Sequence, residues 1–214
     1  MRLKKIAIID YGFGNIRSVV NALNYCATAE AVVINSPVEM SRFNGAILPG
    51  VGAFGPAMHF LKKKGFDEAI YNYVNTGKLI YGICLGFQLF FEKSYENGIH
   101  DGLRLIPGEV KKFEKKNKNM KIPHMGWNNI KIFQNNSYTK KMFKSITNNE
   151  SFYFVHSYYV MPINLLQTSS FCEFGVKFCS SITYKNIWGS QFHPEKSGEK
   201  GLVILKNFIK EVNA

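Results

Sequence analysis

A cysteine stands at the centre of a glycine-flanked pentapeptide, Gly-Ile-Cys-Leu-Gly at residues 82–86. The apolar run at 78–81 is typical of a buried strand, and Phe-Gln-Leu-Phe-Phe at 87–91 is typical of the start of a helix. A strand, a sharp turn and a helix with a nucleophile at the apex form a nucleophile elbow. The pattern therefore predicts that Cys84 is a nucleophile and that the backbone N–H of Leu85 faces a developing oxyanion. A buried structural cysteine between two glycines is the alternative.

A histidine and a glutamate near the C-terminus could activate that thiol. A thiol is mostly protonated at neutral pH, so a nucleophilic cysteine needs a base or a cationic neighbour. The apolar run at 187–192 predicts a strand that ends at His193. Residues two apart in an extended chain point the same way, so we expect Glu195 to lie beside His193 and to fix its tautomer. Pro194 between them agrees with a strand end. A Cys84–His193–Glu195 triad is predicted, with an ordinary polar pair as the alternative for the last two.

The loop Pro-Gly-Val-Gly at residues 49–52 is a third candidate element of the site. Gly50 and Gly52 flank Val51 after a predicted strand, so the backbone can present an N–H where a side chain would obstruct. A glycine-rich turn between strand and helix, or a phosphate cradle, are the alternatives. Dinucleotide binding is disfavoured because the third glycine of the fingerprint and a suitable acidic partner are missing.

Length and composition limit the class of protein. The chain of 214 residues is long enough to bury the core of one large α/β domain, which we expect to span residues 1–214. No apolar stretch approaches the roughly 20 residues of a membrane helix, and the first residues lack the apolar segment of a signal peptide. The 4 cysteines are too scattered for a disulfide framework or a metal site. We therefore expect a cytoplasmic protein without a metal, acting away from the membrane.

The formal net charge of +12 is carried largely by lysines grouped at 62–64, 111–118 and 140–144. Clustered cations could bind nucleic acid through counterion release. A solvated surface is the simpler interpretation, and we favour it and expect no nucleic-acid partner. Some of this charge could instead face a partner protein.

The first half of the chain alternates between apolar strand patterns and helical patterns. The strands are expected at 4–10, 31–34, 45–48 and 79–83, and the helices at 16–26, 37–43, 56–64 and 66–76. Such alternation predicts a parallel sheet with helices on both faces. The carboxyl ends of its strands, and with them the 49–52 loop and Cys84, are expected at one edge, where such sheets bind ligands.

The second half is dominated by strand patterns. We expect them at 110–113, 127–133, 152–155, 158–160, 169–174, 176–184 and 187–192, before a final helix from residue 198. The predicted fold is a single-domain α/β fold. It has a mixed, mostly parallel central sheet, helices on both faces and an added antiparallel layer.

The elbow and the Gln-Phe-His-Pro-Glu sequence at 191–195 resemble the class I glutamine amidotransferases, which use a catalytic triad. Segments at 10–15, 48–54, 123–128 and 152–158 narrow the resemblance to the glutaminase subunits of imidazole glycerol phosphate synthase, an enzyme of histidine biosynthesis. The similarity runs from about residue 5 to the C-terminus in the family's order.

Three residues depart from the family's pattern. Phe87 stands where this subunit usually has methionine, Ser190 replaces a common aliphatic residue, and Arg104 stands where glycine is frequent. No member of the triad is affected.

The resemblance implies the class I glutamine amidotransferase fold and the hydrolysis of glutamine to glutamate and ammonia without a cofactor. It places the N–H groups of Val51 and Leu85 in an oxyanion hole, with the Val51 peptide turning inward in the active complex. Further candidate contacts to the substrate are Gly50, Gly52, Gln88, His156, Ser157 and Tyr158. For His156, a strand-end histidine satisfied by the protein is an equal alternative.

The resemblance also implies a partner. The glutaminase fold accounts for the whole chain, so a separate (β/α)₈-barrel cyclase subunit is expected. This subunit uses the ammonia to convert PRFAR into imidazole glycerol phosphate and AICAR, and the two chains are expected to form a heterodimer. The resemblance places Asn15, Trp127, Tyr153 and Lys196 at the interface, with core packing as the alternative for Trp127 and Tyr153.

Three other functions remain open on the sequence alone. A paralogous subunit could feed ammonia to another acceptor enzyme, such as one that amidates surface sugars, and only Phe87 and Arg104 favour it. A non-catalytic scaffold is disfavoured by the intact Cys84, His193 and Glu195. A basic nucleic-acid-binding module has no supporting motif.

Overall fold

The computed structural model of the protein describes residues 4–115, 120–133 and 136–212. Residues 116–118 of the predicted lysine group, and the two ends of the predicted 1–214 domain, lie outside the described residues. No helix within the described part of the chain is long and apolar enough to cross a membrane.

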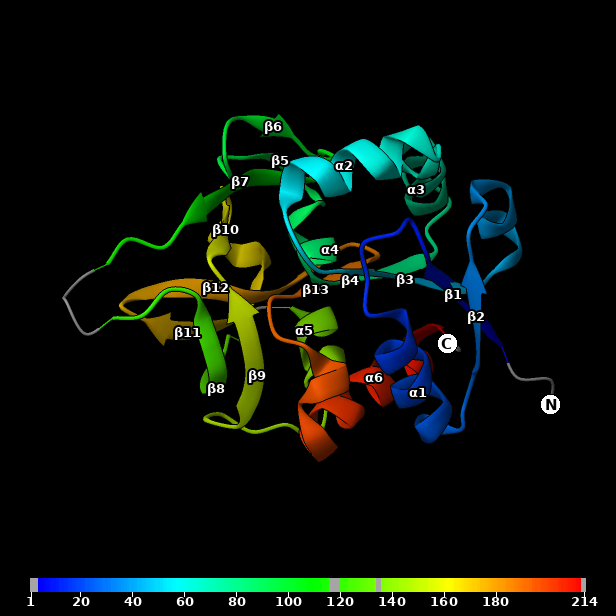
Figure 1. The fold of residues 1–214 in the computed structure, drawn as a ribbon. Coiled ribbons are helices and arrows are strands. Elements are labelled where there is room, and N and C mark those ends of the chain that lie inside the picture. Colours follow the sequence, from blue (N-terminus) through cyan, green and yellow to red (C-terminus); the bar gives the residue numbers. More distant parts are fainter. Residues whose placement is uncertain (1–3, 116–119, 134–135, 213–214) are drawn as a thin grey trace.

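Parallel strands form one half of a mixed nine-stranded sheet (Figure 1). They follow the order β2 (Glu30–Ile34), β1 (Lys5–Ile9), β3 (Gly45–Gly50), β4 (Leu79–Cys84) and β13 (Ile187–Ser190). Every residue of β3 and β4 is buried. Strands that are covered on both faces consist of continuous apolar residues, so these strands could be predicted from the sequence.

Antiparallel strands continue the same sheet. They are β12 (Val176–Tyr184), β11 (Thr168–Phe174), β8 (His124–Ile132) and β9 (Ser151–His156), in that order outward from β13. The predicted mixed sheet is therefore confirmed, with its parallel half toward β2 and its antiparallel half toward β9.

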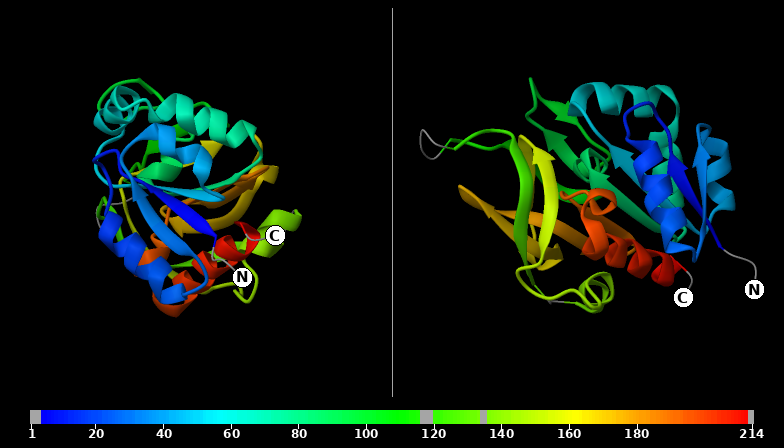
Figure 2. Two further views of the ribbon diagram at one scale, coloured as in Figure 1. Left: turned by 90° about the vertical axis from the view of Figure 1, so that its right-hand side faces the viewer. Right: turned by 60° about the horizontal axis from the view of Figure 1, so that its bottom comes forward.

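Helices cover both faces of the parallel half (Figure 2). Alternate residues of β1 enter two different cores: Ile6 and Ile8 pack with α1 (Ile16–Cys26) and α6 (Gly198–Val212). Ala7 and Ile9 pack with α2 (Phe54–Lys63) and α3 (Phe66–Asn75). The alternation is what a strand buried on both sides requires, because successive side chains point to opposite faces.

A smaller sheet forms the added layer. Its order is β10 (Tyr158–Pro162), β7 (Ile106–Lys112), β5 (Phe91–Ser94) and β6 (His100–Asp101), and it lies at the top of Figure 1, beside α2. The β10–β7 and β5–β6 pairs are antiparallel, whereas β5 and β7 run parallel.

The predicted helix at 87–91 is wrong beyond its first turn. The helix α4 spans only Leu85–Gln88, and β5 begins at Phe91. The carbonyl of Phe90 accepts hydrogen bonds from the N–H groups of Leu105 and Ile106 at 2.9 and 3.0 Å. Pairing with this distant segment therefore replaces the local helical hydrogen bonds. The predicted helix at 37–43 is a 3₁₀ helix, η1 (Pro37–Arg42).

Three short helices complete the described chain. They are α5 (Ser137–Met142), η2 (Leu165–Gln167) and η3 (Pro194–Lys196). The η3 turn follows His193 directly and leads into α6.

Candidate active site

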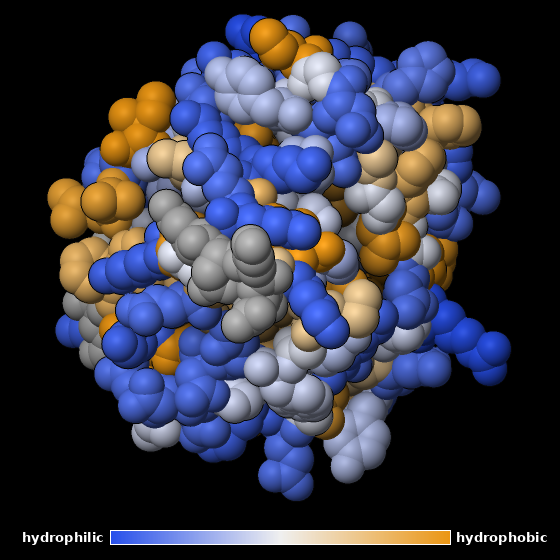
Figure 3. All heavy atoms as spheres, turned by 60° about the vertical axis from the view of Figure 1, so that its left-hand side comes forward, coloured by the Kyte–Doolittle hydropathy of each residue, from blue (hydrophilic) through white to orange (hydrophobic). Residues whose placement is uncertain are grey.

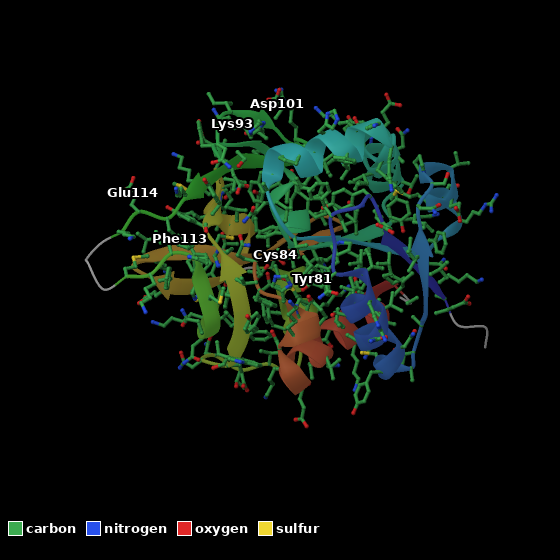
Figure 4. The ribbon with its side chains drawn as sticks, in the orientation of Figure 1. Tyr81, Cys84, Lys93, Asp101, Phe113 and Glu114 are labelled. Atoms are coloured by element: carbon green, nitrogen blue, oxygen red, sulfur yellow. The ribbon has the colours of Figure 1, made fainter. Side chains whose placement is uncertain are left out.

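Cys84 occupies a strained turn between β4 and α4. Its backbone has φ 54° and ψ −108°, a region that residues other than glycine rarely adopt. Such strain persists only where the surrounding structure holds it, and it is common at functional sites. Figure 4 shows Cys84 in the interior of the molecule, near the middle of the ribbon. The predicted elbow is therefore present as a backbone conformation.

Three glycines allow the elbow to pack against the neighbouring strand. A Cβ on Gly86 would lie 1.9 Å from the Leu48 carbonyl oxygen, and one on Gly50 would lie 2.5 Å from the Gly86 nitrogen. A Cβ on Gly82 would lie 2.8 Å from the Phe87 Cα. Contacts this short exclude any side chain, so the glycines at these positions are required by close backbone approach.

His193 and Glu195 form a buried pair. Their Nδ1 and Oε1 atoms lie 2.8 Å apart, and both side chains are at most 2% exposed. The extended geometry predicted for these residues is wrong, because residues 194–196 form the η3 turn. The backbone N–H of His193 donates to the Tyr153 carbonyl at 2.9 Å, which connects the turn to β9. The two side chains thus meet as predicted, but through a tight turn.

His193 interacts with the Cys84 thiol as well as with Glu195. Burial alone would lower the pKa of His193, but interactions with Cys84 and Glu195 outweigh it and raise that pKa to about 10. Within the described chain, Nε2 of His193 is buried and makes no standard hydrogen bond. His193 is therefore held as a cation beside Cys84, which is the environment that a reactive thiolate needs.

A pocket of about 270 Å³ opens over Cys84 and His193. Its lining includes the predicted residues Val51, Gly52, Leu85, Gln88, His156, Ser157 and Tyr158. Gly50 and Glu195 do not line it: Gly50 packs beneath Leu85 and Gly86, and Glu195 bonds to His193. The structure thus gathers residues from the loop after β3, from β4, α4, β9 and β10, and from the segment after β13 around one cavity.

The two N–H groups predicted to form the oxyanion hole differ in whether they already donate a hydrogen bond within the protein. The Leu85 N–H belongs to the first residue of α4, where a helix offers no acceptor of its own. The Val51 N–H donates instead to the Phe13 carbonyl at 3.1 Å. One donor can therefore face the pocket, and the other is engaged elsewhere.

Gln88 is held by its amide nitrogen. Nε2 donates to the Tyr158 carbonyl at 2.9 Å and to Oε1 of Gln191 at 3.0 Å. Both amide hydrogens are thereby used, so only the amide oxygen can serve a ligand, and it can only accept.

His156 has both ring nitrogens engaged within the protein. Nδ1 lies 2.8 Å from the Tyr158 carbonyl, and Nε2 lies 3.1 Å from Nδ1 of His124. Burial lowers the pKa of His156 to about 3, so the ring is neutral. This arrangement favours a histidine that shapes the pocket wall over one that hydrogen-bonds a ligand.

Several residues at the site were not predicted. Gln191 places Nε2 3.7 Å from the Cys84 sulfur, and Glu96, Pro123 and Val155 line the pocket. Gln191 belongs to the motif that contains His193, so its position two residues earlier was an available signal. Glu96 follows β5, which the sequence did not reveal.

With the geometry described, comparison with known proteins decides the family. A family model described as "Glutamine amidotransferase class-I" matches residues 7–212. The chain belongs to the class I glutamine amidotransferases. Within the described residues of this amidotransferase, no cluster of three or more histidine, cysteine or acidic side chains could hold a metal ion.

Curated relatives of this amidotransferase share one name. "Imidazole glycerol phosphate synthase subunit HisH" of Chlorobaculum tepidum is 45% identical over 206 residues, covering 96% of this chain and 99% of the relative. The protein of the same name from Desulfitobacterium hafniense is 44% identical over 208 residues, covering 97% of this chain and 95% of the relative.

Solved structures share the amidotransferase fold at low sequence identity. PurLQS of Thermotoga maritima matches with a TM-score of 0.75 and 17% identity, over 98% of this chain and 99% of that chain. The glutaminase domain of Trypanosoma brucei CTPS matches with a TM-score of 0.66 and 15% identity, over 97% and 94% of the two chains. These likenesses establish the fold alone.

The three departures from the family's pattern have local structural explanations in this amidotransferase. The Ser190 hydroxyl is buried and lies 2.9 Å from both the Tyr81 hydroxyl and the Phe192 carbonyl, so it is satisfied. The Phe87 ring fills the space above Gly189, where a Cβ would lie 2.0 Å from it. Arg104 has φ 55°, which explains why glycine suits this position.

Three of the four predicted interface residues form one surface cluster of the amidotransferase. Trp127 is 58% exposed, which excludes core packing, and its ring lies 6.2 Å from that of Tyr153. The Lys196 ammonium lies 6.0 Å from the centre of the Tyr153 ring. Asn15 caps the N-terminus of α1, which packs against the η3 turn that carries Lys196. Figure 3, with the left-hand side of Figure 1 turned forward, shows a mostly hydrophilic surface with separate hydrophobic patches.

Proposed function

We propose that the protein is the glutaminase subunit of an imidazole glycerol phosphate synthase, in which Cys84, His193 and Glu195 hydrolyse glutamine. The observation that carries the proposal is the strained Cys84 turn beside the buried His193–Glu195 pair, with Cys84 and His193 both lining one small pocket. The relatives named as subunits of that synthase support the assignment to histidine biosynthesis.

In the first half of the reaction, the Cys84 thiolate attacks the side-chain carboxamide carbon of glutamine. A carbon–sulfur bond forms and the electron pair of the C=O bond moves to oxygen, giving a tetrahedral oxyanion. His193 then donates its proton to the nitrogen, the C–N bond breaks and ammonia leaves. The product on the enzyme is a glutamyl thioester.

In the second half, the now neutral His193 removes a proton from water, which attacks the thioester carbon. Collapse of this intermediate breaks the C–S bond and releases glutamate and the thiolate. Glu195 holds the imidazole tautomer and stabilises its charge throughout.

The oxyanion would be held by the backbone N–H groups of Leu85 and Val51. Because Val51 N–H donates to Phe13 here, its peptide must turn before the second donor is available. Loss of one such donor typically lowers the rate by about 10²–10³. A turn of this single peptide is therefore sufficient to switch the glutaminase between weak and strong activity.

Glutamine would lie along the pocket wall with its amino-acid end toward Gln88 and residues 157–158. The Gln88 amide oxygen is an acceptor suited to the substrate's ammonium group. Gly50 and Gly52 would act by leaving the backbone of the 49–52 loop free to move, and His156 by supporting the pocket wall.

The partner would be a (β/α)₈-barrel cyclase that takes up the ammonia and converts PRFAR into imidazole glycerol phosphate and AICAR. Trp127, Tyr153, Lys196 and Asn15 would lie in the interface of this heterodimer. A free thiolate persists in a reducing compartment, so we expect the complex in the cytoplasm.

Glutamate release by the protein mixed with its cognate cyclase subunit tests the proposal. We expect weak hydrolysis by the isolated chain, strong stimulation when the cyclase and PRFAR are both present, and no hydrolysis by Cys84→Ala. Turnover that depends on Cys84 but ignores the cyclase and PRFAR would assign the chain to another acceptor enzyme. No turnover under any condition would refute the glutaminase assignment.

A further inference from the structure

The hydroxyl of Tyr11 is buried beside the site without a hydrogen-bond partner. The side chain is 0% exposed, and within the described chain its oxygen makes no hydrogen bond. Buried hydroxyl groups are nearly always paired, so an unpaired one calls for a physical explanation. The Tyr11 hydroxyl lies next to the 49–52 loop, in which the proposed mechanism requires the Val51 peptide to turn.

The position of the hydroxyl is defined by its contact with Gly50. A Cβ built on Gly50 would lie 2.8 Å from the Tyr11 oxygen, so the phenol borders the backbone of the 49–52 loop. The Tyr11 ring stacks with Phe13 at 6.1 Å between centroids. The Phe13 carbonyl is the group that accepts the Val51 N–H at 3.1 Å. The segment 11–13 thus borders the peptide between Gly50 and Val51.

The charge state of the phenol is settled by its surroundings. Burial raises the pKa of Tyr11 far above its ordinary value, and the electrostatic interaction with Cys84 raises it further. The group therefore stays a neutral O–H, which can donate one hydrogen bond.

Turning a peptide exchanges the directions of its N–H and its C=O. When the Val51 N–H turns toward the pocket, the Gly50 carbonyl must turn away from it, toward segment 11–13. There it would approach the Phe13 carbonyl, which is also an acceptor, and it would need a donor. A buried carbonyl without a donor is costly, so this would oppose the turn.

We propose that Tyr11 is a positioning residue whose hydroxyl donates to the Gly50 carbonyl once this peptide has turned, and so stabilises the complete oxyanion hole. This inference rests on the glutaminase function proposed above. It explains why the hydroxyl has no partner in the present arrangement: its partner arrives with the turn.

The test is Tyr11→Phe, which removes only the oxygen. Because the lost group is unpaired here, the free energy of unfolding of the isolated chain should not fall. In the complex with cyclase and PRFAR, kcat for glutamine hydrolysis should fall about tenfold or more, with KM for glutamine unchanged. Alkylation of Cys84 by iodoacetamide has no oxyanion intermediate, so its rate should equal that of the unsubstituted protein.

Tyr73→Phe is the matched control. Its hydroxyl is also buried but donates to the Phe43 carbonyl at 3.4 Å, away from the pocket, so we expect full kcat and a slightly lower stability. Full stimulated activity of Tyr11→Phe would overturn the proposal. A parallel loss of stability, alkylation rate and kcat would also overturn it, because it would indicate a packing role. If the unsubstituted complex released no glutamate, the proposed function would fail and this inference with it.

Discussion

At the scale of single residues, the site depends on a histidine that keeps its proton although it is buried. His193 lies between the Cys84 thiol and the Glu195 carboxylate, and these two groups raise its pKa against the effect of burial. A cation in this place favours the thiolate and is also the proton source for the leaving ammonia.

The raised pKa of His193 predicts a dependence of stability on pH. Its folded-state pKa of about 10 exceeds the roughly 6.5 of an unfolded histidine. The resulting stabilisation is complete below about pH 6.5 and is lost as the pH rises toward 10. Each tenfold change in proton affinity corresponds to about 1.4 kcal/mol, so the difference between about 6.5 and about 10 corresponds to a contribution on the order of 5 kcal/mol.

Urea unfolding at pH 7 and pH 10 measures this contribution. Between these values, Glu195→Gln and Cys84→Ala should each lose less stability than the unsubstituted protein, because each removes a cause of the raised pKa. Equal pH dependence in all three proteins would contradict a protonated His193.

At the scale of elements, the contact between β3, β4 and α4 defines the nucleophile turn. The glycine spacing around Cys84 allowed this strand, turn and short helix to be predicted, because no other residue fits such contacts. Local sequence could not reveal that the helix stops at Gln88, since the carbonyls after it bond to residues 102–106. The strand β5 was missed for the same reason.

The same limit applies inside the site. The pairing of His193 with Glu195 was predicted, but from extended backbone, whereas a 3₁₀ turn brings the two together. The contact of Tyr11 with Gly50 and the Gln88–Gln191 hydrogen bond join segments far apart in the sequence. Spacing along one chain carries no information about such contacts, so they appear only in the fold.

Gly86→Ala tests the elbow as an element. The added Cβ would lie 1.9 Å from the Leu48 carbonyl oxygen, so the strand and the helix must separate. Overpacking of this kind costs about 1–3 kcal/mol or more, and the displaced Cys84 should lower kcat as well. Urea unfolding and glutamate release measure the two effects.

Gly77→Ala is the control for that experiment. Gly77 has φ 80° but no neighbour within 4 Å, so only the backbone conformation opposes a side chain, at about 1 kcal/mol. Activity should be retained. A Gly86→Ala variant no less stable than Gly77→Ala, and fully active, would show that the close packing is unnecessary.

At the scale of the whole molecule, part of the excess positive charge lies at the C-terminal ends of two helices. Lys62 and Lys63 lie in the last turn of α2, and Lys140 and Lys141 lie in the last turn of α5. Cations near the C-terminus of a helix are favoured by its dipole. These two lysine groups therefore fit the interpretation of the charge as solvated surface, whereas part of the 111–118 group lies outside the described residues.

Docking of a partner should depend on the exposed aromatic cluster around Trp127. Buried aromatic anchors often contribute 2 kcal/mol or more to an interface, so Trp127→Ala should raise the Kd for the cyclase about 30-fold or more. Because Trp127 is 58% exposed in the free chain, stability should change by only about 0.5 kcal/mol. Tyr71→Ala, at a 56% exposed position on α3, should leave the affinity unchanged. Unchanged binding by Trp127→Ala would exclude this surface as the interface.

Covalent labelling by a glutamine-analogue chloroketone, read by peptide mass spectrometry, tests the central claim most directly. Burial raises the pKa of Cys172 and of Cys179 to about 12 and also raises that of Cys26, so these thiols should stay protonated and unreactive. Cys84 alone lines the pocket beside His193. We predict one label per chain, on Cys84, that glutamine slows and Cys84→Ala abolishes. Labelling of another cysteine while Cys84 stays unmodified would contradict the account.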